Sequence, residues 1–372
     1  MSDLKHPSDE ESAKHIPSAA PPYDAASTSS TQAICPAHTT ENKIKARIDL
    51  HIIPFVIVLY LMAFLDRVNI ANARAFGLEK DLGMAGNQYN TALVIFFVPY
   101  ILFEVPSNIL LKHFSPRKWL RDDEREFVKA RLAASSGPSG ADRKITFKDV
   151  KNALCDYKIW LGAFMYFGLI VPAYSYAYFA PTIIQSYKYS PIETQLRSVP
   201  PWAVAFGFAM VVATLSDWAK HRFLFVMGAI CIAISGFAVL ITVHDNLSVQ
   251  YGALFLVVMG TYSAMPVQVC WFNMNLAGHH RRAIGSAWQI GFGNIGGIIS
   301  TFSFVSTDAP YYKKGYAICV SFICLSVLAS AAYAAAITWE NKKRAKTPQN
   351  LDLTEQEKMD LGDMNPEFRY ML

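Results

Sequence analysis

Asp66 and Arg67 are the residues whose types and position point most clearly to chemistry, because they stand side by side after an apolar run over residues 52–65. An unpaired charge at the centre of a membrane helix costs about 3 kcal/mol on insertion scales, so such groups normally face a bundle interior or an aqueous cavity. Asn69 is three residues past Asp66 and lies on the same helical face. We interpret these three residues as part of a pathway for a substrate or a proton. The alternative is that the span ends at Leu65, which would leave Asp66 and Arg67 as a solvated surface pair that contributes little to stability.

Polar and aromatic side chains also recur inside other apolar segments. Tyr174 and Tyr178 are four residues apart and share a helical face, which could stack on a planar substrate; an interfacial aromatic belt is the alternative. The polar groups together outline a polar interior, although each one could instead form a hydrogen bond between helices, the interpretation that we favour for Asn108 and Asn294. The remaining candidates for the pathway are Glu104, Gln268, Asn273 and Gln289.

The composition indicates that membrane helices carry these residues. Hydrophobic residues make up 52 % of the 372 positions and charged residues 17 %, whereas soluble domains are roughly one-quarter charged. A membrane helix needs about 20 mostly apolar residues. We therefore predict an all-α, polytopic membrane protein with about eight transmembrane helices, of which the fourth is the shortest. The predicted spans are residues 50–73, 88–111, 160–184, 200–215, 223–243, 251–276, 284–303 and 315–339.

Basic residues in the short loops predict the orientation of the chain, because such loops remain on the cytoplasmic side. Lysine and arginine gather after the second, fourth, sixth and eighth predicted spans. Both termini are therefore expected in the cytoplasm, with Lys313 and Lys314 as the exception to the pattern. Residues 1–42 are rich in Ser, Pro, Ala and Thr and contain no apolar segment, so we expect a disordered cytoplasmic tail.

Other function classes receive no support from the residues. The net charge of +5 is scattered, which argues against nucleic-acid binding, and the six cysteines have neither CxxC nor Cys/His ligand spacing, so no metal site is expected. A GxGxxG pattern at residues 291–296 lies inside an apolar span instead of after a strand, so it does not indicate a dinucleotide site. Gly293 and Gly297 are instead predicted to let two helices approach closely. We do not expect an enzyme.

Several long strings of the sequence carry a resemblance to a known family. Around the first two predicted spans they are KIKARIDLHIIPF, FLDRVNIANA, GLEKDLGMAGNQYN and FEVPSNILLKHFSPRKWL. Over the last six spans they are SVPPWAVA, LSDWAKHR, AGHHRRAIGSAWQIGFGNIGG, DAPYYKKGY and LGDMNPEFRYML. Over nearly everything after residue 42, the chain resembles the fungal allantoate and nicotinate permease group, anion:cation symporters of the major facilitator superfamily.

The resemblance implies a major-facilitator-type bundle of twelve spans in two halves, with the substrate held between the halves at mid-membrane. This chain has eight predicted spans. SPRKWL, which leads into the third span in the family, is followed at once by RDDEREFVKARL, which resembles the loop after the sixth. Spans three to six are therefore expected to be absent between Leu120 and Arg121. The expected organisation is two spans in residues 43–120, a cytoplasmic central loop in 121–158, a six-span bundle in 159–340 and a cytoplasmic C-terminal tail in 341–372.

The same resemblance implies roles for individual residues. Asp66 would bind the coupling proton, and Arg67 would pair with a carboxylate of the substrate. In the family, further ionisable residues of the site lie on span four, which is absent here. The implied cytoplasmic gating motif comprises Lys112, Arg117, Lys118, Asp217 and Arg222, although Trp218 stands where the related motif often has a basic residue.

The expected function is proton-coupled import of small organic anions such as nicotinate, allantoate, a vitamin or a ureide, at the plasma membrane. The expected partners are the anion and the lipid bilayer, with no cofactor, nucleic acid or known protein partner. The alternative is a truncated, non-transporting membrane product of the same family, from mis-splicing or an incompletely predicted gene. In such a chain, polar groups that face the cavity would meet lipid or water instead of partner helices. We expect this alternative to hold for uptake, which should equal background.

Overall fold

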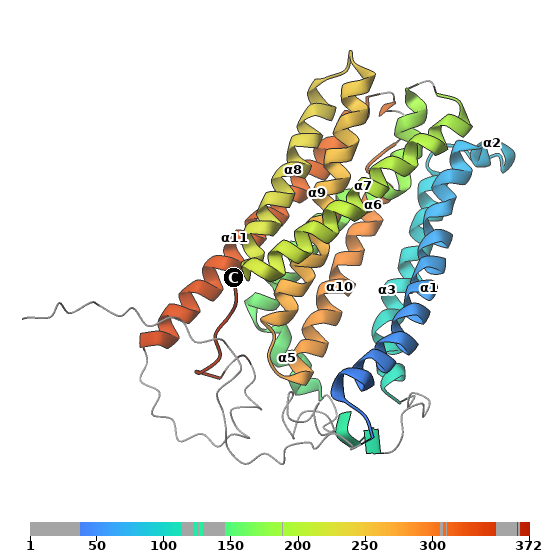
Figure 1. Ribbon diagram of the computed structural model, residues 1–372. Coiled ribbons are helices and arrows are strands. Elements are labelled where there is room, and N and C mark those ends of the chain that lie inside the picture. The colour runs from blue at the N-terminus through green and yellow to red at the C-terminus, as the bar shows by residue number, and fades with distance from the viewer. Residues whose placement is uncertain are drawn as a thin grey trace, which may run out of the picture. The chain divides into compact units, whose positions relative to one another are not determined.

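The computed structural model describes residues 38–113, 123–124, 126–128, 146–187, 189–305, 308–309, 311–346, 363 and 365–372, without the side chains of residues 104–113 and 279. Throughout these residues the regular elements are helices (Figure 1). The all-α prediction is confirmed. The predicted N-terminal tail lies almost wholly outside the described residues.

Eight long helices correspond to the eight predicted spans. Among the described residues, six of them are long and apolar enough to cross a membrane; α10 is more polar, and α3 has only a shorter apolar stretch, Gln88–Phe103. The eight helices are α1 (Glu41–Ala75), α3 (Gln88–His113), α6 (Tyr157–Ser186), α7 (Pro191–Ala219), α8 (Arg222–Thr242), α9 (Leu247–Met274), α10 (His279–Thr301) and α11 (Lys313–Lys346).

The fourth long helix, α7, is not the shortest span that the sequence predicted. It begins at Pro191, nine residues before the expected start at Pro200, and is 29 residues long. The hydroxyl of Ser190 caps its first turn by accepting a hydrogen bond from the backbone N–H of Glu193 at 3.2 Å. Pro200 and Pro201 lie inside the helix, where neighbouring groups in a membrane bundle can satisfy the backbone carbonyls that a proline frees.

Two short helices lie between the long ones. The helix α2 (Leu78–Asp81) follows α1, and α5 (Phe147–Leu154) lies inside the predicted central loop. A reciprocal capping box explains the start of α5, because the backbone N–H of Thr146 donates to the carboxylate of Asp149 at 2.9 Å. The predicted loop therefore contains ordered structure immediately before α6.

The helix α6 is the most enclosed of the candidate spans, and it contacts α1, α9, α10 and α11. In its most apolar window 67 % of the residues are buried. The helices α8 and α9 run side by side (Figure 1). The helix α7 packs on α9, and α3 packs on α10. The two N-terminal helices thus reach the C-terminal bundle through α6 and α10.

The helix α1 is enclosed least. None of the residues in its most apolar window is buried, and only 17 % are buried in the corresponding window of α7. Large side chains are exposed along α1; Phe55 is 64 % and Tyr60 is 71 % exposed. In a membrane, this surface must contact lipid or other helices, because exposing apolar side chains of this size to water costs free energy.

Candidate functional site

Arg67 lies where α1, α3 and α6 meet. Its Nη1 donates a hydrogen bond to the phenolic oxygen of Tyr174 at 2.5 Å. The guanidinium carbon is 4.4 Å from the ring centroid of Phe96 and 5.2 Å from that of Tyr100, both on α3. Arg67 Nε is buried and has no hydrogen-bond partner among the described residues. The Arg67 site, as we call Arg67, Phe96, Tyr100, Tyr174 and Asn294, is thus cationic and walled by aromatic rings.

Tyr174 is held in place from two sides. Its ring stacks on that of Tyr178 with centroids 5.7 Å apart, and Phe97 meets it edge-on at 5.1 Å. Its hydroxyl also lies 3.5 Å from the amide oxygen of Asn294 on α10, at the long limit of a hydrogen bond. The two tyrosines therefore form part of the bundle interior, and Tyr178 is buried almost completely.

Two glycines allow α10 to approach the neighbouring helices. A Cβ added at Gly297 would lie 2.2 Å from the Phe97 ring on α3, and one added at Gly293 would lie 2.2 Å from the Tyr166 ring on α6. Contacts this short are not tolerated between carbon atoms, so the absence of a side chain at both positions sets how closely the helices pack. The same close approach brings Asn294 toward Tyr174.

Asp66 and Asn69 lie on the exposed side of α1, away from the rings around Arg67. Neither side chain forms a hydrogen bond or an ion pair with any residue that the structure describes. The sequence places Asp66 and Asn69 on one helical face and assigns both, with Arg67, to one pathway; the structure does not bring these two side chains together with Arg67. The helical rotation between consecutive residues is 100°, so Asp66 and Arg67 point in different directions.

Three of the predicted pathway residues bond neighbouring helices or turns instead of meeting Arg67. The Nε2 of Gln268 donates to the hydroxyls of Ser326 and Ser330 on α11 at 3.1 and 3.2 Å. Gln289 donates to the carbonyl of Gly162 on α6 at 3.3 Å. Asn273 donates to the carbonyl of Val269 within α9 and accepts from Ser286 of α10. Hydrogen bonds of this kind join helices in a membrane.

The remaining predicted residues are only partly described. Glu104 and Lys112 belong to α3, but their side chains lie outside the described set, as do Arg117 and Lys118 altogether. Asp217 and Arg222 form an ion pair between the end of α7 and the start of α8. Asp217 is 64 % exposed, so this pair is a surface contact of small energetic value.

Sequence reasoning missed the α3 contribution to the site. Phe96 and Tyr100 are four residues apart, stack on each other at 5.8 Å and present one aromatic face to Arg67. Their spacing is visible in the sequence, but only the tertiary contact identifies the arginine that they face. No cluster of three His, Cys, Asp or Glu side chains suited to a metal ion occurs in the described part of the chain.

Comparisons with known proteins agree with a membrane transporter. The family model described as Major Facilitator Superfamily matches residues 124–301. The MFS-type transporter cnsO of Penicillium expansum is 24 % identical over 90 % of this chain and 91 % of its own length. The high-affinity nicotinic acid transporter of Saccharomyces cerevisiae is 23 % identical over 90 % of this chain and 86 % of its own. The major facilitator-type transporter hxnP of Emericella nidulans is 21 % identical over 89 % and 93 %.

The lengths of the alignments differ from the length of the chain. The alignment with cnsO runs over 479 positions, whereas this chain has 372 residues. More than 100 positions of that alignment are therefore filled by the relative alone, with no residue of this chain opposite them.

Proposed function

The chain belongs to the major facilitator superfamily of membrane transporters, and from this premise we propose that the Arg67 site binds small organic anions. The observation that carries the proposal is the state of the Arg67 guanidinium. Nη1 is engaged by Tyr174, whereas Nε is buried without a partner among the described residues. A buried N–H group without an acceptor costs free energy. A carboxylate that accepts hydrogen bonds from Nε and Nη2, in the bidentate geometry common for arginine, would remove that cost.

The proposed substrate class is a planar, aromatic carboxylate. The faces of Phe96 and Tyr100 beside the guanidinium offer stacking surfaces, and stacking favours a flat ring over a flexible chain. Nicotinate has this shape, and one relative is named as a nicotinic acid transporter. Nicotinate is therefore the first ligand to test, with allantoate as a carboxylate of the same charge that lacks an aromatic ring.

The proposed coupling ion is the proton, with Asp66 as its carrier. A carboxylate next to a cation that binds an anion can release and recover a proton as the anion arrives and leaves. The proposed direction is import across the plasma membrane, with both termini in the cytoplasm, in line with the distribution of basic loops. Asp66 is exposed in this chain, so the carboxylate is not enclosed with Arg67.

On the question of transport we favour a second candidate function, in which this eight-span chain binds an anion but does not carry it across the membrane. The exposed apolar face of α1 and the exposed Asp66 support this candidate, because a transport cavity must be walled on all sides. The length difference from the relatives supports it as well. We place the missing spans at the junction of Leu120 and Arg121.

Binding and uptake are tested separately. Equilibrium dialysis of radiolabelled nicotinate against the purified chain in nanodiscs should give saturable binding, which Arg67→Gln abolishes. Arg74→Gln is the matched control, because Arg74 also lies on α1 and also stands 4.2 Å over an aromatic ring, that of Tyr89. Equal binding by wild type and Arg67→Gln would refute the anion site.

Uptake of labelled nicotinate or allantoate by cells that express this chain should equal the background of cells with an empty vector. Saturable, pH-dependent uptake that Asp66→Asn abolishes would show instead that eight spans suffice.

A further inference from the structure

The C-terminal strap, which we define as Asp363 with residues 365–372, lies across the end of the bundle where α6 and α10 begin and α9 and α11 end. Residues 347–362 separate it in the sequence from α11. Its side chains and main chain contact α6, α9, α10 and α11, and the carbonyl of Leu372 accepts from the N–H of Arg222 at the start of α8. None of these contacts belongs to the Arg67 site.

A buried charged cluster joins the strap to α6 and α10. Asp363 is 1 % exposed, forms an ion pair with Arg281 of α10, and lies 3.8 Å from Lys158 Nζ of α6. Asp156, the N-cap of α6, contacts the same two cations. Burial raises the pKa of the Asp363 carboxyl, while Arg281 and Lys158 act to lower it. Desolvation therefore offsets much of what these ion pairs contribute to docking.

Arg344 of α11 makes the strongest attachment, because it binds the main chain of the strap. Its Nη1 donates to the carbonyls of Asn365 and Phe368 at 3.0 and 2.9 Å, and its Nη2 donates to the carbonyl of Asp363 at 2.8 Å. Hydrogen bonds from a charged donor are roughly twice as strong as neutral ones. One side chain thereby fixes the path of several strap residues.

Two asparagines each form a reciprocal pair of hydrogen bonds with the main chain of the strap. Asn275, just past α9, donates to the carbonyl of Met371 at 2.9 Å and accepts from its N–H at 2.7 Å. Asn341 of α11 does the same for Tyr370, at 2.8 and 2.9 Å. Trp271 adds a hydrogen bond from its indole N–H to the carbonyl of Met371 at 2.8 Å. These side chains bind two successive strap residues as an extended peptide is bound, through its backbone groups.

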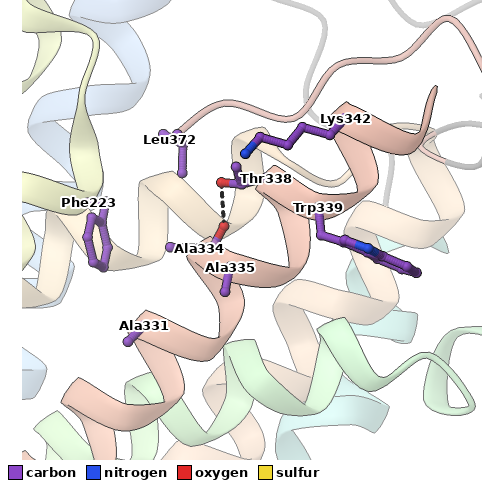
Figure 2. A pocket seen from close by; sticks show the side chains of 8 residues that line it. All are labelled: Phe223, Ala331, Ala334, Ala335, Thr338, Trp339, Lys342 and Leu372. Atoms are coloured by element: carbon purple, nitrogen blue, oxygen red, sulfur yellow. Dashed lines mark hydrogen bonds between the residues drawn. The ribbon is translucent and has the colours of Figure 1, made fainter. Parts of the chain in front are cut away.

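Side-chain pockets give this contact its sequence preference. The Tyr370 ring is 5 % exposed; its hydroxyl accepts from Lys158 Nζ at 2.5 Å and donates to the Asp363 carboxylate at 3.1 Å. Leu372 lines a pocket of about 460 Å³ between Phe223 of α8 and Thr338 of α11 (Figure 2). A peptide that lacked the tyrosine hydroxyl would leave Lys158 and Asp363 without a shared polar partner.

We propose that this end of the bundle is a peptide-binding surface whose ligand is the strap of this same chain, docked reversibly. Reversibility follows from the kind of contact, because most of the bonds are polar and desolvation of the buried charges offsets much of their contribution. The Tyr370 ring adds to the apolar cluster that α6, α9 and α11 form. The strap binds the first turns of α6 and α10, and the same two helices carry Tyr174 and Asn294 further along. Docking therefore sets the relative position of two walls of the Arg67 site, a consequence that rests on the proposed function.

The direct test adds the strap in trans. A variant that ends at residue 360 is placed in nanodiscs and titrated with a fluorescein-labelled peptide of residues 361–372, and fluorescence anisotropy is measured. We expect saturable binding that weakens at least tenfold when the protein carries Arg344→Gln or the peptide carries Tyr370→Phe. Arg369→Gln in the peptide is the control, because Arg369 is exposed and, within the described part of the chain, bonds only carbonyls of the strap itself. Absent binding, or equal affinity with Arg344→Gln, would overturn the proposal.

A second measurement uses the full-length chain in case the shortened variant does not fold. Met371→Cys in a cysteine-free background is labelled with a maleimide, and the rate reports how often the strap leaves its surface. Arg344→Gln should raise the rate at least tenfold, and Arg369→Gln should leave it unchanged. Equal rates in all three proteins would contradict reversible docking. Neither assay contains an anion, so its outcome is independent of whether the Arg67 site binds nicotinate.

Discussion

Arg67 of α1 and Tyr174 of α6 are joined by a 2.5 Å hydrogen bond from Nη1 to the phenolic oxygen, although 107 residues separate them in the chain. The bond links the N-terminal pair of helices to the C-terminal bundle. It also leaves the Nε edge of the guanidinium for a ligand. The orientation of the cation in the proposed anion site thus depends on a residue of the other part of the chain.

Tyr174→Phe should weaken nicotinate binding about tenfold, which corresponds to about 1.4 kcal/mol. The phenylalanine keeps the ring beside the guanidinium but removes the acceptor that orients it, and hydrogen bonds to charged groups contribute about 1.5–3 kcal/mol. Isothermal titration calorimetry measures the change. Tyr178→Phe is the matched control, because Tyr178 stacks on Tyr174 and has no hydrogen bond to Arg67. An unchanged affinity in Tyr174→Phe would mean that the hydroxyl does not orient the arginine.

Gly297→Ala should destabilise the protein by about 1–3 kcal/mol, the usual cost of overpacking, because the new methyl group would meet the Phe97 ring at 2.2 Å. The thermal midpoint of unfolding in detergent, followed by tryptophan fluorescence, should fall. Gly207→Ala on α7 is the control, since nothing lies within 4 Å of a Cβ there, and alanine favours a helix by about 1 kcal/mol over glycine. Adding Phe97→Leu to Gly297→Ala should recover part of the loss. If both glycine variants behave alike, α3 and α10 do not pack as described.

Glu124→Gln should loosen the segment that follows the Leu120–Arg121 junction. Glu124 is fully buried and receives two hydrogen bonds from Arg47 Nη1 of α1, at 2.9 and 3.0 Å. Replacing the carboxylate by an amide removes the charge-assisted part of this contact, a cost of about 1 kcal/mol because Arg47 is half exposed. Hydrogen exchange of residues 123–128 should accelerate. Glu126→Gln, at an exposed position of the same segment, should not change it, and equal exchange in both variants would contradict the contact.

Uptake should appear when four spans are restored between Leu120 and Arg121. A chain with spans three to six of the Saccharomyces nicotinic acid transporter inserted there should take up labelled nicotinate above background, because the inserted helices would enclose Asp66 and cover α1. The insert with Arg67→Gln is the control and should be inactive. The genomic sequence across the junction should contain a coding segment for four apolar spans if the gene was predicted incompletely. Absence of such a segment would contradict that explanation.

The helical spans were predictable because their signal is local. A run of apolar residues long enough to cross a bilayer must be a helix or part of a barrel, since no water is present to satisfy its backbone. The predicted start of α7 at Pro200 is wrong, because the sequence gives no sign that the helix continues through two prolines. In the folded chain they are internal, and Ser190 and Pro191 form the actual start. Local residue types cannot reveal that tertiary neighbours tolerate a proline.

The polar residues were harder to assign than the spans, because a buried amide is equally suited to a cavity and to a helix contact. Gln268 and Gln289 bond α11 and α6. Asn294 lies 3.5 Å from the Tyr174 hydroxyl, between α10 and α6, in line with the helix contact that we favour for it from the sequence. The rotation between adjacent residues separates Asp66 from Arg67. Which residues converge depends on helix rotation and packing, and both are properties of the assembled bundle.

The sequence by itself determined the all-helical class of the protein and the approximate extent of its eight long helices, and it pointed to Arg67 as a cation of interest, because hydropathy and charge act over a single helix. Only the tertiary structure decided that Phe96, Tyr100 and Tyr174 surround that cation, that Asp66 faces outward, and that the C-terminal strap closes one end of the bundle. Those relationships join residues up to 212 positions apart, such as Lys158 and Tyr370. They exist only because packing brings distant helices within hydrogen-bond distance.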